Sequence, residues 1–352
     1  MRRLLVATAA LLVACSDALE QTSTAGQVIG VVNATDRTLS LVSATDFTVA
    51  TRTWPGTGGA PTTIAGRGNV FVVPLGQADA VGVSVLRPPC QGLCALSDYT
   101  LSLPAGSGAT GVAIQDDSIA WVANPNLNTV TRLNYQTSDT ASVAVGVSPQ
   151  AVAIVGTRVF VVNANLVSGT SAGPSWITSF DCCAVTTRDS IPLTGTNARF
   201  AVVGDDSLLY VVASGDSGQA EGKLSIVDPV ARAEIAVLNG LGESPGAAAV
   251  HPSGRVLIAS PTEGILEVYA PTKTVTRGPG NGVKPGGGGV AGLAVDLRGR
   301  VYAVGAGPIT PPALCTFVPG VVHVLTAPPD YREIHTVTVG CSPTTAAVAA
   351  TP

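Results

Sequence analysis

The sequence is poor in charge and in long apolar segments. Only 12% of its 352 residues are charged, the net charge is −4, and lysine and arginine form no cluster. Nucleic-acid binding is therefore not expected, because it requires concentrated basic residues that neutralise phosphates. The apolar run from Leu4 to Ala14 is shorter than the ~20 residues that span a bilayer as a helix.

The chain also lacks a helical apolar pattern. No apolar spacing of about 3.6 residues lasts for three turns. Short runs of Val, Thr, Ile, Ser and Ala alternate instead, separated by Gly, Pro, Asn and Asp, as is typical of strands and turns. Because 46% of the residues are hydrophobic, a core is available and disorder is excluded. The sequence predicts an all-β protein.

The first residues have the layout of an export signal. Arg2 and Arg3 precede the apolar run, and small residues precede Cys15, as in secretory signal peptides. The ending "LVAC" resembles the bacterial lipobox, in which cleavage leaves the cysteine as a lipid-bearing first residue. The resemblance implies a signal peptide over 1–14 and a membrane anchor at Cys15. The polar and small residues that follow are expected to form a flexible tether, so that the lipidated cysteine and the tether together span 15–27. The alternative is an ordinary signal peptide cut nearby, with Cys15 incidental.

A repeat accounts for the rest of the sequence. A strand, a tight turn and a second strand recur, and the last apolar residues of the first strands lie 40 to 53 residues apart, at Ile64, Ile114, Ile154, Val203, Val250, Val295 and Val348. A large side chain follows in the second strand, at Phe71, Trp121, Phe160, Tyr210, Leu257 and Tyr302. A period of about 45 residues with four strands per unit is the spacing of β-propeller blades.

The two ends of the repeat region complete one blade. The last first strand, "TTAAVAA", has no second strand after it, whereas residues 28 to 54 supply three strands without a first. The sequence thus predicts a seven-bladed β-propeller over 28–352, with four-stranded blades and with the C-terminal strand joining the N-terminal blade. Such closure removes exposed sheet edges.

Several segments are similar to known propeller repeats. "WVANPNLNTVTRLN" and "FVVNANL" resemble YVTN-type repeats, and "GLAVDLRGRVYAV" and "AAAVHPSGRVLIAS" resemble NHL-type blades. The resemblance covers residues 28–350 and implies the propeller fold. It implies no single activity, because these families include binding scaffolds, lactonases and lyases.

Four of the other cysteines are expected to form two disulfides, as an exported protein permits. Cys90 and Cys94 share one outer turn, and Cys315 and Cys341 occupy loops of one blade that open on the same face. The sequence therefore predicts the pairs Cys90–Cys94 and Cys315–Cys341. The motif "CQGLC" is not expected to bind metal, because no second Cys or His cluster completes four ligands.

The two remaining cysteines are adjacent in the chain. Cys182 and Cys183 occupy an outer turn of the fourth blade, too far round the ring to reach the other cysteines. A vicinal disulfide and a pair of free thiols both remain open for them.

The long loops are expected to gather on one face of the ring, which we call the loop-rich face. They include "NANLVSGTSAGPS", "ASGDSGQAEG", "GAGPITPPALCTFVPG" and "GPGNGVKPGGGG", and long loops on a rigid scaffold commonly carry function. We call the last apolar residue of each first strand the anchor of its repeat. The residue four positions before each anchor should lie at the mouth of the central channel on this face. These residues are Ala60, Thr110, Gln150, Arg199, Gly246, Ala291 and Thr344. Gln150 and Arg199 could hold a carboxylate or phosphate by forked hydrogen bonds. The alternative is that Arg199 pairs with an acidic loop residue.

Three asparagines recur at the end of second strands. Asn33, Asn124 and Asn163 follow the large side chain of their blade by about three positions. They are candidates for ligand contact at the channel mouth. The alternative is that their amides satisfy local backbone groups where the strand turns.

No catalytic set is found. "GDSG" at residues 215–218 imitates a serine-protease motif, but a nucleophile needs a base within hydrogen-bond reach, and none of the three histidines is expected near it. A shift of the repeat alignment by two residues would bring Asp79, Asp216 or Glu263 towards the channel.

We therefore expect a binding protein with no catalytic residues, metal or cofactor. It would be a monomer, anchored in the cell envelope through lipid on Cys15, with Ser16 favouring the outer membrane. Its loop-rich face would present a binding scaffold to a protein or surface glycan. The alternative is an enzyme of lactonase or lyase type that acts on a small molecule at the channel mouth.

Overall fold

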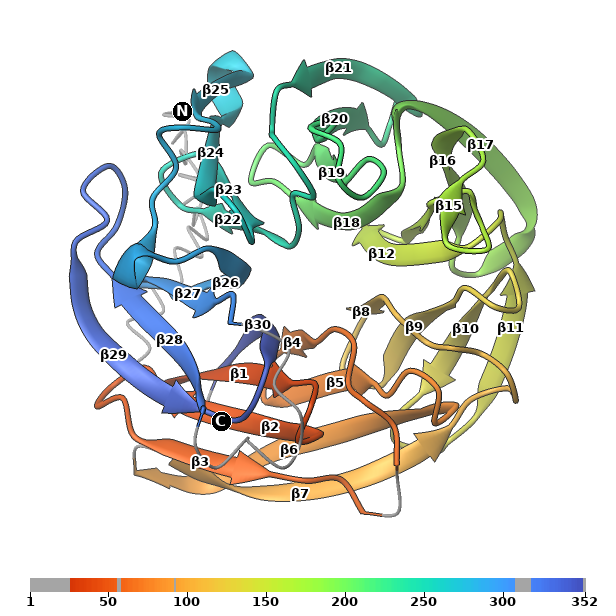
Figure 1. Cartoon of the computed structure of the whole chain (residues 1–352). Helices are drawn as coiled ribbons and strands as arrows, with labels where there is room; N and C mark the ends of the chain where they lie inside the picture. The colour runs from red at the N-terminus through yellow and green to blue at the C-terminus, as the bar shows by residue number, and fades with distance from the viewer. Residues whose placement is uncertain (1–25, 56–57, 92, 308–317, 351–352) are drawn as a thin grey trace, which may run out of the picture.

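The computed structural model describes residues 26–55, 58–91, 93–307 and 318–350. This part of the chain is all-β and forms seven four-stranded antiparallel sheets, arranged as blades around a central axis (Figure 1). The predicted seven-bladed β-propeller is confirmed. Two short 3₁₀ helices occur in the described ranges, η1 (Ala270–Thr272) and η2 (Pro285–Gly287). No helix there is long and apolar enough to cross a membrane.

The blades are numbered from the N-terminus, and their strands are given from the channel outwards. Blade 1 comprises β30 (Pro343–Ala350), β1 (Gln27–Asn33), β2 (Thr38–Ser43) and β3 (Val49–Arg52). Blade 2 comprises β4 (Ala65–Arg67), β5 (Val70–Pro74), β6 (Ala80–Gln91) and β7 (Leu93–Ser102). Blade 3 comprises β8 (Val112–Ile114), β9 (Ile119–Asn124), β10 (Thr129–Asn134) and β11 (Thr140–Ala144).

The other four blades continue round the ring. Blade 4 comprises β12 (Pro149–Val155), β13 (Arg158–Asn163), β16 (Pro174–Asp181) and β17 (Ala184–Thr196), and a separate hairpin of β14 (Leu166–Val167) and β15 (Thr170–Ser171) lies within it in sequence. Blade 5 comprises β18 (Ala198–Val203), β19 (Leu209–Ala213), β20 (Lys223–Asp228) and β21 (Ala233–Asn239). Blade 6 comprises β22 (Ala248–His251), β23 (Arg255–Ser260), β24 (Gly264–Tyr269) and β25 (Thr274–Arg277). Blade 7 comprises β26 (Val290–Val295), β27 (Val301–Gly305), β28 (Gly320–Leu325) and β29 (Glu333–Val339).

The C-terminal strand closes the ring. In six blades the strands follow one another in chain order, but in blade 1 the innermost strand is β30, which pairs antiparallel with β1. Val348 lies opposite Ile29, and Ala346 lies opposite Val31. Figure 1 shows this blade as red and orange strands beside a dark blue one. The predicted union of the two ends is confirmed.

The hydrophobic core lies between neighbouring blades. Side chains alternate along each strand, so in β27 Tyr302 packs towards blade 1, whereas Val301 and Ala303 pack towards blade 6. Each of the seven interfaces has such a cluster. The large side chains that mark the repeat are fully buried in these clusters: Phe71, Trp121, Phe160, Tyr210, Leu257 and Tyr302.

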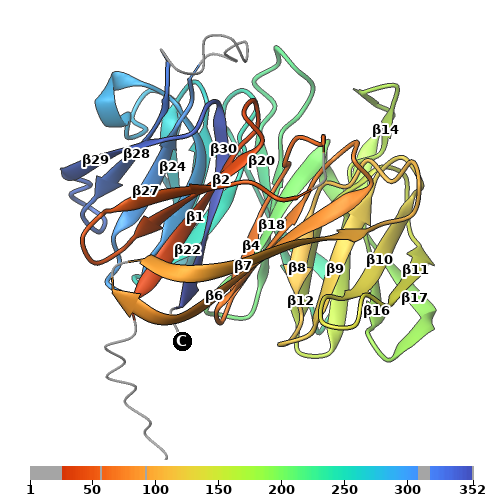
Figure 2. The same ribbon diagram turned by 90° about the horizontal axis from the view of Figure 1, so that it is seen from below.

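The two faces of the ring differ. The loop-rich face carries the connections from β13 to β16, from β19 to β20 and from β25 to β26. Figure 2 shows the ring from the side, with β14 projecting at this face.

The expected signal peptide 1–14 and nearly all of the segment 15–27 lie outside the described residues, since β1 begins at Gln27.

Candidate functional site

The central channel contains a cavity of about 140 Å³ to which all seven blades contribute. Its wall is formed mainly by small or apolar residues, such as Gly111, Val152 and Ala248. Arg199 is the one charged residue of the described lining, and Gln150 lies on the neighbouring blade. The structure therefore brings Gln150 and Arg199 together in the cavity, whereas the other five residues that the repeat alignment selects do not line it: Ala60, Thr110, Gly246, Ala291 and Thr344.

A β-bulge places each of these two side chains. The pairing of β12 with β13 shifts between Pro149 and Ala151, and the pairing of β18 with β19 shifts between Ala198 and Phe200. Gln150 and Arg199 are the extra residues, without a partner in the ladder. Bulges redirect a side chain and are frequent beside functional sites.

The same irregularity recurs at the corresponding positions of two other blades. The register shifts around Ala291 in β26 and around Thr344 in β30. Both residues also occupy the alignment position four before the anchor. The buried hydroxyl of Thr344 has no hydrogen-bond partner in the described chain. Thus the bulge is a repeated feature of the inner strands, and two of the bulged residues, Gln150 and Arg199, place polar side chains in the channel cavity.

Arg199 is positioned by Asn197. The guanidinium Nε donates to Asn197 Oδ1 at 2.8 Å, and Asn197 Nδ2 donates to the carbonyl oxygen of Gly215 at 2.7 Å. The side chain is accessible from the channel, but the wall removes part of its hydration and lowers the pKa of the guanidinium. No carboxylate forms an ion pair with Arg199 among the described residues. The expected alternative, an acidic loop partner, is not found there, and the terminal nitrogens are available to a ligand.

Gln150 is held in an equivalent way. Its Nε2 donates to Ser148 Oγ at 3.1 Å. Ser148 and Asn197 each lie two residues before the bulged residue, with φ of 53° and 52°. Asn and Ser are common in such turns. Sequence reasoning missed these two positioning residues; the turn-forming residue type at the same offset in both blades is the signal that could have found them.

The three recurring asparagines lie inside their blades. Asn33, Asn124 and Asn163 are fully buried, and their Nδ2 atoms donate across the sheet to third-strand hydroxyls at 2.8–3.0 Å: Ser40 for Asn33, Thr131 for Asn124 and Thr178 for Asn163. None of them lines the cavity. They hold the second and third strands together, and their burial places them away from the cavity lining.

Asp79, Asp216 and Glu263, which a shift of the repeat alignment would bring towards the channel, contact loops instead. None of the three lines the cavity. The backbone N–H of Gly106 donates to Asp79 at 2.7 Å and, ahead of other contacts, lowers the pKa of that carboxyl. The other two contact neighbouring loops: Asp216 accepts from the N–H of Ser171 at 3.2 Å, and Glu263 lies 3.8 Å from Lys284 Nζ.

The three histidines also contact groups away from the channel. His251 Nδ1 accepts the N–H of Ser253 at 3.0 Å in the turn after β22. His323 Nδ1 lies 3.2 Å from a carboxylate oxygen of Glu333, between the two outer strands of blade 7. His335 stacks on Phe47 with ring centroids 4.7 Å apart. None of the three lines the channel cavity, so within the described residues no histidine stands beside Arg199 as a general base.

The cysteines divide as follows. Cys94 and Cys341 are disulfide-bonded. The side chain of Cys90 and all of Cys315 lie outside the described residues, so both predicted pairings stay predictions. Cys182 and Cys183 are free thiols. Burial, and then the contact with Cys183, raise the pKa of Cys182 to about 11.

Comparisons with known proteins show the fold alone. No family model and no curated protein matches the sequence. Among solved structures, hydrazine synthase of Kuenenia stuttgartiensis is 13% identical, with a TM-score of 0.62 over 83% of this chain and 91% of that one. AztD of Citrobacter koseri is 9% identical, with a TM-score of 0.57 over 93% and 99%. A catalytically inactive His-to-Ala variant of virginiamycin B lyase from Staphylococcus aureus, solved with quinupristin, is 10% identical, with a TM-score of 0.58 over 80% and 92%.

Proposed function

We propose that this chain is a binding propeller that takes an anionic group of its partner, a carboxylate or phosphate, into the central channel from the loop-rich face. The observation that carries the proposal is Arg199, which lines the cavity without an acidic partner in the described chain. A guanidinium presents a planar fork of donors that matches the oxygens of such anions. Gln150 on the next blade supplies a neutral donor and acceptor beside it.

The size of the cavity supports a partner larger than the cavity itself. Pockets that enclose whole drug-sized molecules have volumes of about 300–1,000 Å³, whereas this one has about 140 Å³. It can accept one acidic group while the rest of the partner rests on the surrounding loops. An acidic protein side chain or an acidic sugar of a surface glycan carries such a group.

The site does not favour the enzymatic alternative. A lactonase or lyase needs an acid, a base or a metal at the reacting centre. The described lining has no His, Asp, Glu or Cys. The variant of virginiamycin B lyase that lacks one histidine is catalytically inactive, and no histidine is found in the described lining of this channel cavity.

The proposed setting is the cell envelope. We infer from "LLVACSD" that lipid on Cys15 anchors the chain, with the outer membrane favoured, and that a single propeller acts as a monomer held off the bilayer by its tether. The YVTN- and NHL-like segments support the propeller part of this proposal, and the lipobox-like "LVAC" supports the anchor.

The test is ligand-dependent thermal stability of the protein and of Arg199→Gln. A carboxylate or phosphate at about 100 times its Kd should stabilise the protein by ~2.7 kcal/mol. Because hydrogen bonds to a charged group contribute about 1.5–3 kcal/mol, R199Q should weaken binding by about 10- to 100-fold. Arg52→Gln makes the same change of charge on the exposed outer strand β3 and should bind as the wild type does. Equal binding by R199Q and the wild type would refute the proposal.

A further inference from the structure

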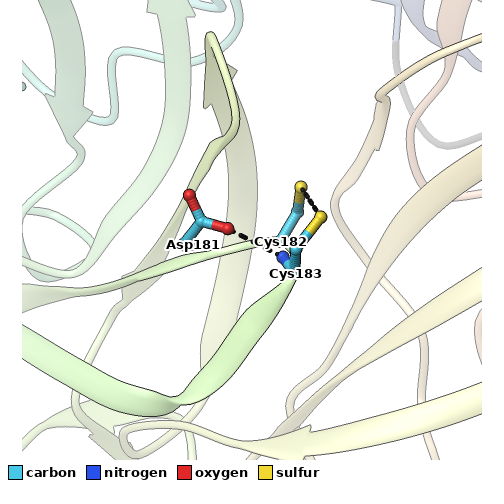
Figure 3. A group of neighbouring side chains, drawn as sticks. All are labelled: Asp181, Cys182 and Cys183. Atoms are coloured by element: carbon cyan, nitrogen blue, oxygen red, sulfur yellow. Dashed lines mark hydrogen bonds between the residues drawn. The ribbon is translucent and has the colours of Figure 1, made fainter.

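A second feature, unrelated to the channel, lies in the turn between β16 and β17. Cys182 and Cys183 are free thiols whose sulfurs are 3.5 Å apart. Adjacent residues of a strand point to opposite faces, but here the turn directs both thiols to the same side (Figure 3). The separation is well above the ~2.05 Å of a disulfide bond, so the two sulfurs are not covalently bonded, and one thiol donates a hydrogen bond to the other.

The separation suits two thiolates on one metal ion. With Zn–S bonds of about 2.3 Å and tetrahedral geometry, two sulfur ligands lie about 3.8 Å apart. A carboxylate oxygen of Asp181 and both sulfurs lie within 4.8 Å of one another. In the part of the chain that the structure describes, no other group of three Cys, His, Asp or Glu side chains meets this spacing.

The turn is held in this conformation by hydrogen bonds that do not use the sulfurs. Asp181 Oδ1 accepts the N–H of Cys183 at 2.9 Å, and Oδ2 accepts Thr157 Oγ1 at 2.7 Å. The N–H of Cys182 donates to the carbonyl oxygen of Thr157 at 2.8 Å. Metal-binding carboxylates are commonly oriented by such outer contacts. The turn is thus tied to the neighbouring turn between β12 and β13.

The two cysteines also differ in their exposure to solvent. Cys182 packs against the apolar cluster between blades 3 and 4, whereas Cys183 is exposed. A bound ion would therefore be anchored by the blade through Cys182 and remain accessible from solvent past Cys183.

We propose that Asp181, Cys182 and Cys183 form a binding site for a thiophilic divalent cation of the zinc type. Two thiolates and one carboxylate oxygen would be the protein ligands, and the fourth tetrahedral position would be open to water or to a donor from another molecule. Binding releases the two thiol protons to solvent. Sulfur ligands select soft and borderline cations over Mg²⁺ or Ca²⁺. The site lies on the face opposite the loop-rich face, so it acts independently of Arg199.

The test is metal binding by the purified full-length protein in its thiol-reduced state. Titration with Cd²⁺ is monitored by thiolate-to-metal charge-transfer absorption and by calorimetry. It should show one Cd²⁺ site in the wild type that is absent from Cys182→Ser and from Cys183→Ser. A large excess of Zn²⁺ should compete with Cd²⁺ for this site. Asp181→Asn should bind at least about tenfold more weakly. Alkylation followed by mass spectrometry should show that metal protects Cys182 and Cys183.

A matched control is available in the next blade. Asp228 accepts the N–H of Val230 at 2.8 Å in the corresponding turn of blade 5, which has no thiol. Asp228→Asn should therefore leave Cd²⁺ binding unchanged. Cd²⁺ binding that survives in C182S or C183S would overturn the proposal, as would equal affinity in D181N and the wild type. An absence of metal binding with rapid oxidation of the pair to a vicinal disulfide would do the same.

Discussion

Glu267 shows how a single buried charge is stabilised between two blades. Only 3% of its surface is exposed. Its carboxylate accepts hydrogen bonds from Tyr331 of blade 7, from Thr276 Oγ1 at 2.6 Å and from Arg255 Nε at 3.1 Å. Burial raises the pKa of Glu267, but the contacts from Thr276, Tyr331 and Arg255 outweigh it and lower the pKa below the usual value of 4.5.

Glu267→Gln should destabilise the propeller by about 1–3 kcal/mol, because the charge-assisted hydrogen bonds weaken. A carboxyl whose pKa is lower in the folded state contributes stability above its unfolded pKa and loses it as the pH falls through the folded value. The wild-type free energy of unfolding should therefore fall below about pH 4.5, and E267Q should show a smaller fall. Denaturant unfolding between pH 3 and pH 7 measures this; parallel pH profiles for the two proteins would contradict it.

Glycine residues let the inner strands approach one another. A Cβ added to Gly292 in β26 would lie 2.5 Å from Thr345 Cα, and one added to Gly111 would lie 2.3 Å from the carbonyl oxygen of Gln150. Both contacts join neighbouring blades beside the channel. The glycines are required here by close approach of the backbone and not by an unusual φ.

Gly292→Ala should therefore destabilise the fold by about 1–3 kcal/mol, as overpacking of a tight interior does. Gly278→Ala is the control, since its added Cβ meets nothing nearer than 3.5 Å. Thermal unfolding should show a lower Tm for G292A and little change for G278A. Equal Tm values would indicate that the blades can move apart at the channel without cost.

The strands could be predicted from the sequence, but the irregularities within them could not. The repeat of apolar runs and of one large side chain, such as Tyr302, depends on burial between blades and is visible in residue types. The bulges at Gln150 and Arg199 depend on a local register shift, which no residue type specifies. The alignment selected these two positions by their offset from the anchors. It could not show that Arg199 has no acidic partner among the described residues, because that depends on loops from other blades.

The ring should depend on β30 as a whole. β30 pairs with β1 and also packs beside β26 and β4. A chain that ends at Ser342 would leave the edge of β1 unpaired, including the apolar residues Ile29 and Val31, and unpaired edges promote association between chains. Such a chain should lose cooperative thermal unfolding and elute as oligomers in gel filtration.

A synthetic peptide with the sequence of residues 343–350 should restore part of the cooperativity by pairing with β1. A chain that ends at Ala350 is the control and should behave like the full-length protein. If the chain ending at Ser342 stays monomeric with an unchanged Tm, closure by β30 does not stabilise the ring.

The bulges at the start of the inner strands also bear on how such a molecule can diverge. A bulged residue has no ladder partner, so its side chain can be exchanged without changing the pairing of the strands on either side. Two of these residues, Gln150 and Arg199, line the central channel cavity. Selection can therefore alter what enters the ring by changing a few codons, while the frame that keeps it folded stays constant.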